Sequence, residues 1–234
     1  MEKFSPLSHL IALGLLSWLY VMLRRAAGRD ELVRARLLIT GGLLAWIVAS
    51  SVLAYHGGYL ALNEDYLLLV LGQAATPTLL AILALASREV RELLARFIAR
   101  IPYASLTRLH VFRIAALGTI YKGYIGALPG HFILPVGVPD LLIGLTALPL
   151  SRRIAGGLGP NRSLFISWHV LGAGCLLLAV PLIQLSQPGP LHFFTQGPAT
   201  DEVLSFPMSI VPTFVAPMLI LLHAAALIKA GRET

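Results

Sequence analysis

The sequence is poor in charge and in cysteine. Only 12% of its 234 residues are Asp, Glu, Lys or Arg, whereas a water-soluble domain carries about 25%. The one cysteine, Cys175, lies in an apolar run, so the chain has no disulfide and no multi-thiolate metal framework. A water-soluble globular domain is therefore excluded on composition.

The signature motifs of several enzyme classes are also missing. The sequence contains no GxxxxGK[ST] phosphate loop, no HExxH zinc helix, no CxxC pair and no GxSxG nucleophile turn. The last apolar run has no lysine at its middle, which excludes a retinal Schiff base at that place. No motif names a reaction, and we expect a protein that is not an enzyme.

Apolar residues are abundant instead. They make up 57% of the chain, and the mean hydropathy is +0.80. A helix needs about 20 apolar residues to cross the roughly 30 Å core of a bilayer. The sequence predicts a single all-α transmembrane domain over residues 1–234, a bundle of seven helices. These are expected at about 7–23, 37–55, 66–87, 107–127, 139–151, 163–184 and 207–229.

Fifteen of the eighteen Lys and Arg residues lie in four short segments between these runs. The segments are Arg24–Arg36, Arg88–Arg108, Arg152–Arg162 and Lys229–Arg232. Because cytoplasmic loops collect Lys and Arg, we expect the N-terminus outside and the C-terminus in the cytoplasm of a bacterial cytoplasmic (inner) membrane. The net charge of +7 then faces anionic lipid headgroups. Membrane lipids and other membrane subunits are the expected partners, and nucleic acid is not.

Two segments are expected to depart from simple spans. The segment near 88–100 places apolar side chains on one helical face and arginines on the other, which is typical of an amphipathic helix on the cytoplasmic surface; the alternative is an ordinary solvated loop helix. The fifth helix is expected to be short and broken, because Pro129, Pro135 and Pro139 precede it. Residues 129–139 would form an outer loop or a dip into the membrane.

Two opposite charges are expected at similar depth on the fourth and fifth helices. Counted from Arg108 and Arg152, Lys122 lies about 20 Å and Asp140 about 18 Å from the cytoplasmic edge. A Lys122–Asp140 ion pair would compensate both charges. In one alternative, Lys122 extends its ammonium outward to the membrane interface. In another, Asp140 is part of a ligand or ion site at a broken helix.

A second group of polar residues is expected nearer the cytoplasm. Arg113, His169 and His223 each lie roughly 7–10 Å inside their helices by the helical rise. On the fourth helix, His110, Arg113 and Tyr121 share a face at 100° per residue. Two axial imidazoles, His169 and His223, with Arg113 on a propionate, would suit haem b.

The same side chains allow two other hypotheses. A small anion or a lipid headgroup would bind through charged and polar groups of this interior. The candidates for that ligand site are Arg113, Lys122, Asp140, Tyr121 and His110. In the simplest alternative, these groups only form hydrogen bonds between helices.

Three stretches of the C-terminal half resemble a broad group of small, uncharacterised bacterial multi-pass membrane proteins. They are RIAALGTIYKGYIGALPGHFILPVGVPDLLIG, WHVLGAGCLLLAV and VPTFVAPMLILLHAAAL. The matching positions are Arg113, Gly126, Leu128, Pro129, Phe132, Pro135, Gly137, Asp140, Gly144, Trp168, Pro212, Phe214, Pro217 and His223. The sixth helix departs from that pattern, since His169 and Cys175 stand where Asn and Asp are expected. The resemblance implies a shared fold and a site around Arg113, Asp140 and His223, and it supplies no activity.

These features lead to three hypotheses for function. The first is a non-enzymatic binding, transport or accessory-subunit role for a small anion or lipid headgroup in a polar bundle interior. The second is a haem b-binding electron-transfer protein that uses His169 and His223. The third is a membrane enzyme that acts on lipid.

Overall fold

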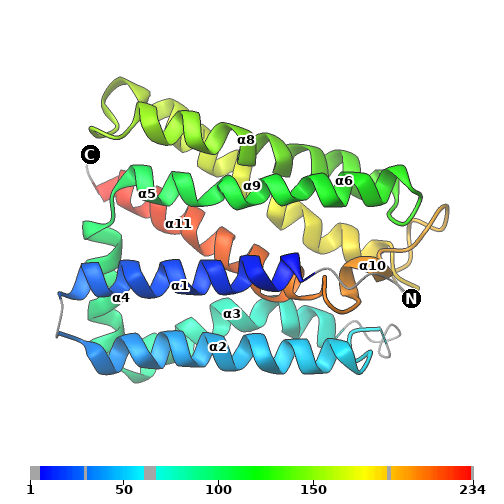
Figure 1. Cartoon of the computed structure of the whole chain (residues 1–234), viewed down its shortest axis with the longest axis horizontal. Coiled ribbons are helices and arrows are strands. Elements are labelled where there is room, and N and C mark those ends of the chain that lie inside the picture. The colour runs from blue at the N-terminus through cyan, green and yellow to red at the C-terminus, as the bar shows by residue number, and fades with distance from the viewer. Residues whose placement is uncertain (1–5, 29–30, 61–66, 189–190, 233–234) are drawn as a thin grey trace. The chain divides into compact units, whose positions relative to one another are not determined.

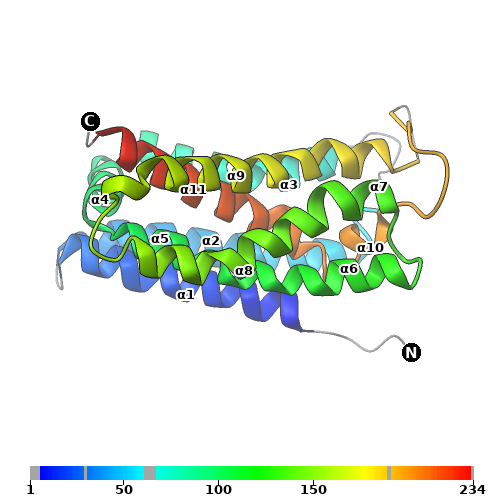
Figure 2. The ribbon, with the colours of Figure 1, turned by 90° about the horizontal axis from the view of Figure 1, so that it is seen from above.

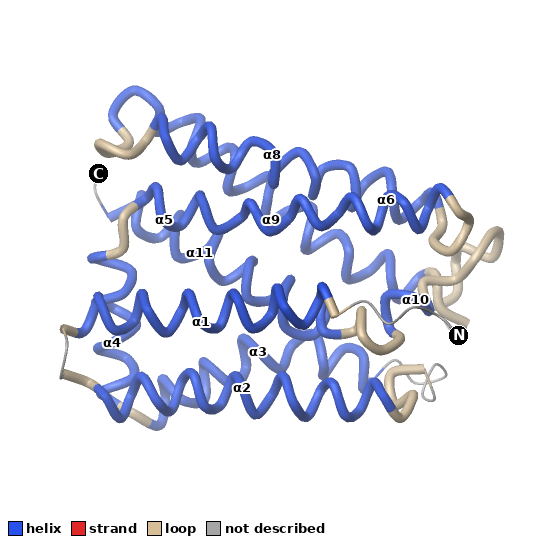
Figure 3. Tube along the Cα trace, viewed as in Figure 1, coloured by secondary structure: helices blue, strands red, loops and turns tan. Residues whose placement is uncertain are grey.

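The computed structural model describes residues 6–28, 31–60, 67–188 and 191–232, and this part of the chain contains helices and turns but no strand (Figure 3). The α-helices are α1 Leu7–Ala27, α2 Val33–Tyr55, α3 Leu67–Ala86, α4 Arg88–Arg100, α5 Tyr103–Arg108, α6 Ala116–Tyr124, α7 Gly130–Phe132, α8 Val138–Arg153, α9 Arg162–Leu185, α10 Asp201–Leu204 and α11 Ala216–Arg232. Two 3-10 segments, η1 Leu109–Ala115 and η3 Gly159–Asn161, and two π segments, η2 Ile133–Gly137 and η4 Val211–Val215, join or extend them. The predicted all-α fold is confirmed for these residues.

Five helical stretches among the described residues are long and apolar enough to cross a membrane. They are Leu7–Ala27, Val33–Tyr55, Gly130–Arg153, Gly159–Leu185 and Val211–Arg232. The α3 and α4 helices form a sixth candidate if their 119° bend lies within one span. A helix satisfies all its backbone hydrogen bonds internally, as the bilayer core requires. The chain is a membrane protein by this criterion, and the count of seven spans and the orientation stay predictions.

The amphipathic segment forms a helix with the predicted bounds. α4 begins after Ser87, whose hydroxyl accepts a hydrogen bond from the backbone N–H of Val90. Its apolar face, with Val90, Leu93 and Phe97, is buried. The predicted third helix begins at residue 66, which lies outside the described residues.

The fifth helix is neither short nor broken, so that prediction is wrong. α7, η2 and α8 follow one another without interruption from Gly130 to Arg153, over 24 residues. The π segment is the physical reason. Its wider turn contains Pro135 and removes the tight contact that a proline ring makes in a regular α-helix. Pro129 is the N-cap, where a missing N–H costs little.

The described residues divide into two compact units. Unit one comprises the described parts of Met1–Leu62, Leu67–Ile101 and Val203–Met218. Unit two comprises those of Pro102–Glu202 and Leu219–Thr234. The single domain expected over residues 1–234 stays a prediction, and each unit is described by itself.

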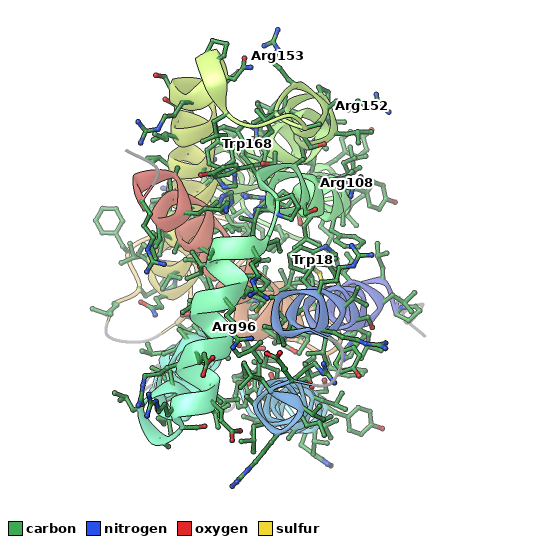
Figure 4. The ribbon with its side chains drawn as sticks, turned by 90° about the vertical axis from the view of Figure 1, so that its left-hand side faces the viewer. Trp18, Arg96, Arg108, Arg152, Arg153 and Trp168 are labelled. Atoms are coloured by element: carbon green, nitrogen blue, oxygen red, sulfur yellow. The ribbon has the colours of Figure 1, made fainter. Side chains whose placement is uncertain are left out.

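In unit one, α1 and α2 lie side by side in opposite directions, and α4 crosses their ends (Figures 1 and 2). Arg96 and Arg100 of α4 donate to the carbonyls of Ala27 and Ala26 at the end of α1, over 3.2 and 2.7 Å. Cations are favourable at a helix C-terminus because the unpaired carbonyls carry negative partial charge. Figure 4 shows Arg96 on α4 and Trp18 on α1.

A freed carbonyl ties three helices of unit one together. Pro217 has no N–H to give to the carbonyl of Thr213, four residues earlier in the helix. The indole N–H of Trp46 and the hydroxyl of Thr76 donate to that carbonyl over 3.0 and 3.2 Å. The proline therefore creates an acceptor that α2 and α3 satisfy.

In unit two, α5, η1 and α6 form one run that lies against α8 (Figure 1). The two backbones approach closely at Gly144, where an added Cβ would lie 2.5 Å from the backbone nitrogen of Ile114. Only glycine allows this contact, which sets α8 against η1. α9 packs on α8, and the indole N–H of Trp168 donates to the hydroxyl of Thr146 over 2.9 Å.

Candidate functional site

Three histidines meet in unit two, one from each of three helical elements. His110 lies on η1, His169 on α9 and His223 on α11, and all three are fully buried. The rings of His110 and His223 are stacked, with centroids 3.9 Å apart. The centroid of His169 lies 4.9 Å from that of His223. One ring nitrogen from each histidine lies within 4.8 Å of those of the other two. We call these three residues the histidine cluster.

Arg113 lies beside this cluster and is held entirely by groups of unit two. It forms an ion pair with Asp140 and donates to the carbonyl of Gly172 over 3.0 Å. It also donates to Nε2 of His223 over 2.9 Å and to Sγ of Cys175 over 2.7 Å. The positive charge of Arg113 is therefore offset by Asp140, and its orientation is fixed by four partners.

The hydrogen bonds of the cluster run in one direction. A guanidinium can only donate, so Nε2 of His223 accepts from Arg113 and the ring proton of neutral His223 sits on Nδ1. That Nδ1–H donates to Nδ1 of His169 over 2.8 Å. Neutral His169 then carries its proton on Nε2, which donates to the hydroxyl of Thr107 over 3.3 Å. Both tautomers follow from the fixed donor at Arg113.

His110 is the exception in this network. Both of its ring nitrogens are buried, and neither has a hydrogen-bond partner among the described residues. Its ring stacks on His223 and meets the edge of Trp168 at a centroid distance of 5.4 Å. A buried polar group without a partner costs about 1–3 kcal/mol, and a bound water or ion is one explanation for such a group. Both ring nitrogens of His110 are therefore available to bind a ligand, as far as the described residues are concerned.

The 3-10 segment η1 explains why His110 and Arg113 share a face. Residues three apart eclipse one another in a 3-10 helix, which turns 120° per residue. The stripe expected to continue to Tyr121 does not do so, since Tyr121 is 60% exposed. The 100° period used for that prediction does not hold through η1, so the face turns away beyond Arg113.

The predicted Lys122–Asp140 pair is wrong. Lys122 pairs with Glu202 of α10, and Asp140 pairs with Arg113. Depth was counted from Arg108, but the helical run begins at Tyr103, five residues earlier. At 1.5 Å per residue, that start adds about 8 Å to the depth of both Arg113 and Lys122. Arg113 rather than Lys122 then matches the level of Asp140.

The structure brings together five of the residues proposed from the sequence. They are His110, Arg113, Asp140, His169 and His223. Thr107, Trp168 and Cys175 were not proposed as site residues. The spacing of three between Thr107, His110 and Arg113 was the available signal, because it fits a 3-10 face. The roles of all these residues in ligand binding stay predictions.

Most of the chain matches one family model. The model is that of a domain of unknown function (DUF8737), and it covers residues 70–230, which include the histidine cluster, Arg113 and Asp140. No curated protein and no solved structure matches the chain. The match agrees with the expected resemblance to uncharacterised proteins, and the bacterial, multi-pass membrane character of that group stays a prediction.

Proposed function

The chain belongs to the DUF8737 family, and from its own side chains we propose that it is a membrane protein that binds a transition-metal ion in unit two. The ligands are His110, His169 and His223. The observation that carries the proposal is the convergence of three buried imidazoles, one of which has both nitrogens without a partner. Imidazole is a ligand for Zn, Cu, Fe and Ni ions, which are the expected class.

The cluster is close to the dimensions of such a site. Zn–N bonds of about 2.0–2.1 Å place tetrahedral nitrogens about 3.3 Å apart. The three nitrogens lie within 4.8 Å of one another, so binding of one ion requires the rings to rotate toward it. Trp168 and Phe165 pack on His169 at centroid distances of 4.9 and 4.3 Å and form an apolar shell around it. Such a shell limits solvent access to a bound ion.

Metal binding competes with the hydrogen bonds that now hold His223. An ion bound at Nδ1 of His223 moves the proton of the neutral ring to Nε2. Nε2 then no longer accepts from Arg113, which keeps Asp140, Gly172 and Cys175 as partners. This competition weakens binding and suits an ion that is taken up and released. It favours a non-enzymatic binding or transport role over a permanent structural ion.

The same geometry ranks the other ligands. Haem b, the alternative with His169 and His223 as axial ligands, requires a macrocycle between two rings that are now hydrogen-bonded over 2.8 Å. A single ion requires only ring rotation. An anion or a lipid headgroup would have to bind to Arg113. This is unfavourable because Asp140 already offsets the charge of Arg113 and its N–H groups already donate to four partners.

The distribution of Lys and Arg along the sequence gives the membrane topology that we propose for this protein. We assign seven spans, an outer N-terminus and a cytoplasmic C-terminus in a bacterial cytoplasmic membrane. Lipids are the surrounding partners, and other membrane subunits are the expected partners if the protein is an accessory subunit.

Metal analysis of the purified protein tests this function. The protein is purified in mild detergent without chelators, equilibrated with Zn²⁺ or Cu²⁺, desalted and measured by mass spectrometry of the metal. We expect a stoichiometric ion that His110→Leu and His169→Leu lose. His192→Leu is the matched control, since His192 bonds only the carbonyl of Phe194 among the described residues.

Two results would contradict the proposal. Metal retention unchanged by His110→Leu would place the ion elsewhere. A Soret band in protein from haem-replete cells, lost in His169→Leu, would favour the haem alternative.

A further inference from the structure

A pocket that is open to the surface lies in unit one, at the end of α1. A cavity of about 470 Å³ is lined by Tyr20, Val21, Arg24, Arg25 and Gly28. Its volume is within the usual range of small-ligand sites, roughly 300–1,000 Å³. The two arginines occupy the last turn of α1, a helix of membrane-spanning length. The cavity therefore lies where a spanning helix meets the headgroup region.

Arg36 of α2 carries a buried charge over the ring of Tyr20. It is only 5% exposed, and its Nε and Nη1 have no hydrogen-bond partner among the described residues. Its guanidinium carbon lies 5.3 Å from the ring centroid of Tyr20, which is one of the residues that line the cavity. A buried charge without a counter-charge costs several kcal/mol, so an anion is expected nearby.

The described chain does not supply that anion. Neither Arg24, Arg25 nor Arg36 forms an ion pair with any described carboxylate. Glu31, whose carboxyl carbon lies 3.9 Å from a Cβ built at Gly28, pairs with Arg96 over 2.5 Å. Two arginines thus line the cavity and a third, Arg36, lies over the ring of Tyr20, and none of the three charges is offset by a described carboxylate.

We propose that this cavity binds the phosphate group of an anionic phospholipid. Arg24 and Arg25 donate charge-assisted hydrogen bonds to the phosphate oxygens. Arg36, stacked on Tyr20, adds the buried positive charge that the phosphate compensates. The position at the end of a membrane-length helix favours a lipid headgroup as the source of the phosphate. This site shares no residue with the histidine cluster and does not depend on the metal proposal.

The test compares two arginine pairs at equivalent positions. Arg24→Gln with Arg25→Gln removes the lining charges, and Arg152→Gln with Arg153→Gln is the matched control. The control pair occupies the last turn of α8 (Figure 4). Delipidated protein in micelles of a non-ionic, phosphate-free detergent is titrated with phosphatidylglycerol, and bound lipid is counted by native mass spectrometry.

We expect the first double variant to bind phosphatidylglycerol about tenfold more weakly or worse, as loss of one charged hydrogen bond implies. The control should bind like the wild type. Equal binding by all three proteins, or equal loss in both double variants, would overturn the proposal. Competing inorganic phosphate distinguishes the source: lipid retained in its presence supports a headgroup site, and lipid displaced by it overturns the assignment to lipid in favour of soluble phosphate.

Arg36→Met provides a second measurement that does not depend on the lining arginines. The variant removes the buried unpaired charge, so without anionic lipid it should melt at or above the temperature of the wild type. Phosphatidylglycerol should raise the melting temperature of the wild type and not that of the variant. An equal rise in both proteins would show that Arg36 does not contribute to the site.

Discussion

At the scale of single residues, Arg113 determines the arrangement of the polar interior of unit two. Its guanidinium has donors and no acceptor, so every group around it must accept. That requirement fixes the tautomer of His223 and, through it, that of His169. A lysine at this position could not reproduce the planar fork that reaches four partners at once.

The Arg113–Asp140 pair yields a prediction for stability. The Arg113 side chain is 1% exposed and that of Asp140 is 21% exposed. Asp140→Asn removes the counter-charge and leaves a buried guanidinium, so the free energy of unfolding should fall by about 3–5 kcal/mol. Asp140→Leu combined with Arg113→Met removes both charges and should recover much of that loss.

The measurement is unfolding of the detergent-solubilised protein, and Lys122→Met with Glu202→Leu serves as the control cycle. That pair is about one third exposed on both sides, so its coupling should be about 0–1 kcal/mol. If the Arg113 and Asp140 variants are simply additive, the pair does not stabilise the fold.

At the scale of elements, glycines set how closely the helices around the cluster approach. A Cβ built at Gly172 of α9 would lie 2.5 Å from Cε1 and 2.7 Å from Nε2 of His223, and 3.2 Å from Nη1 of Arg113. Gly174, two residues along the same helix, has no atom within 4 Å of such a Cβ. Alanine substitutions at Gly172 and Gly174 therefore distinguish a steric effect on the histidine cluster from an effect on the stability of α9 itself.

Gly172→Ala is expected to displace the ring of His223 and break its hydrogen bond with Arg113. Overpacking of this kind costs about 1–3 kcal/mol. Stoichiometric metal retention should be lost because the ring of His223 is pushed out of the cluster. Gly174→Ala should be neutral or slightly stabilising, because alanine has the higher helix propensity. Thermal unfolding and metal analysis of both variants check this, and an intact ion in Gly172→Ala would contradict the placement of His223.

The elements also show which structural features can be predicted from sequence. The helix at 88–100 was predicted within its bounds, because the apolar period and the Ser87 cap act locally. The continuous helix from Gly130 to Arg153 was not predicted, because closely spaced prolines usually indicate a helix break. The sequence pattern does not reveal that a π segment contains Pro135.

The site could be predicted only in part for a related reason. His169 and His223 were grouped correctly by depth because they lie on regular α-helices. The partner of Asp140 was predicted incorrectly because the depth of each side chain has to be counted from the start of the helix, which is Tyr103 and not Arg108. Tyr121 was placed with His110 because the 3-10 period of η1 is not visible in an apolar pattern.

At the scale of the whole molecule, orientation in the membrane is a prediction from the distribution of cations and can be tested across one helix. α9 has 24 residues, about 36 Å of helix at 1.5 Å per residue, which exceeds the roughly 30 Å of the bilayer core. Arg153 precedes this helix and Gln196 follows it, and both are exposed. If α9 spans the membrane, these two positions lie on opposite sides, whatever the total number of spans.

Single cysteines at these positions decide which side is which. Cys175→Ser first removes the natural thiol while keeping an acceptor for Arg113. An impermeant maleimide added to intact cells should then label Gln196→Cys and not Arg153→Cys, because the Arg152–Arg162 segment is predicted to be cytoplasmic. Arg153→Cys should become labelled once the cells are permeabilised, which confirms that its thiol is reactive. Labelling of Arg153→Cys alone on intact cells would reverse the orientation, and labelling of both would show that α9 does not span the membrane.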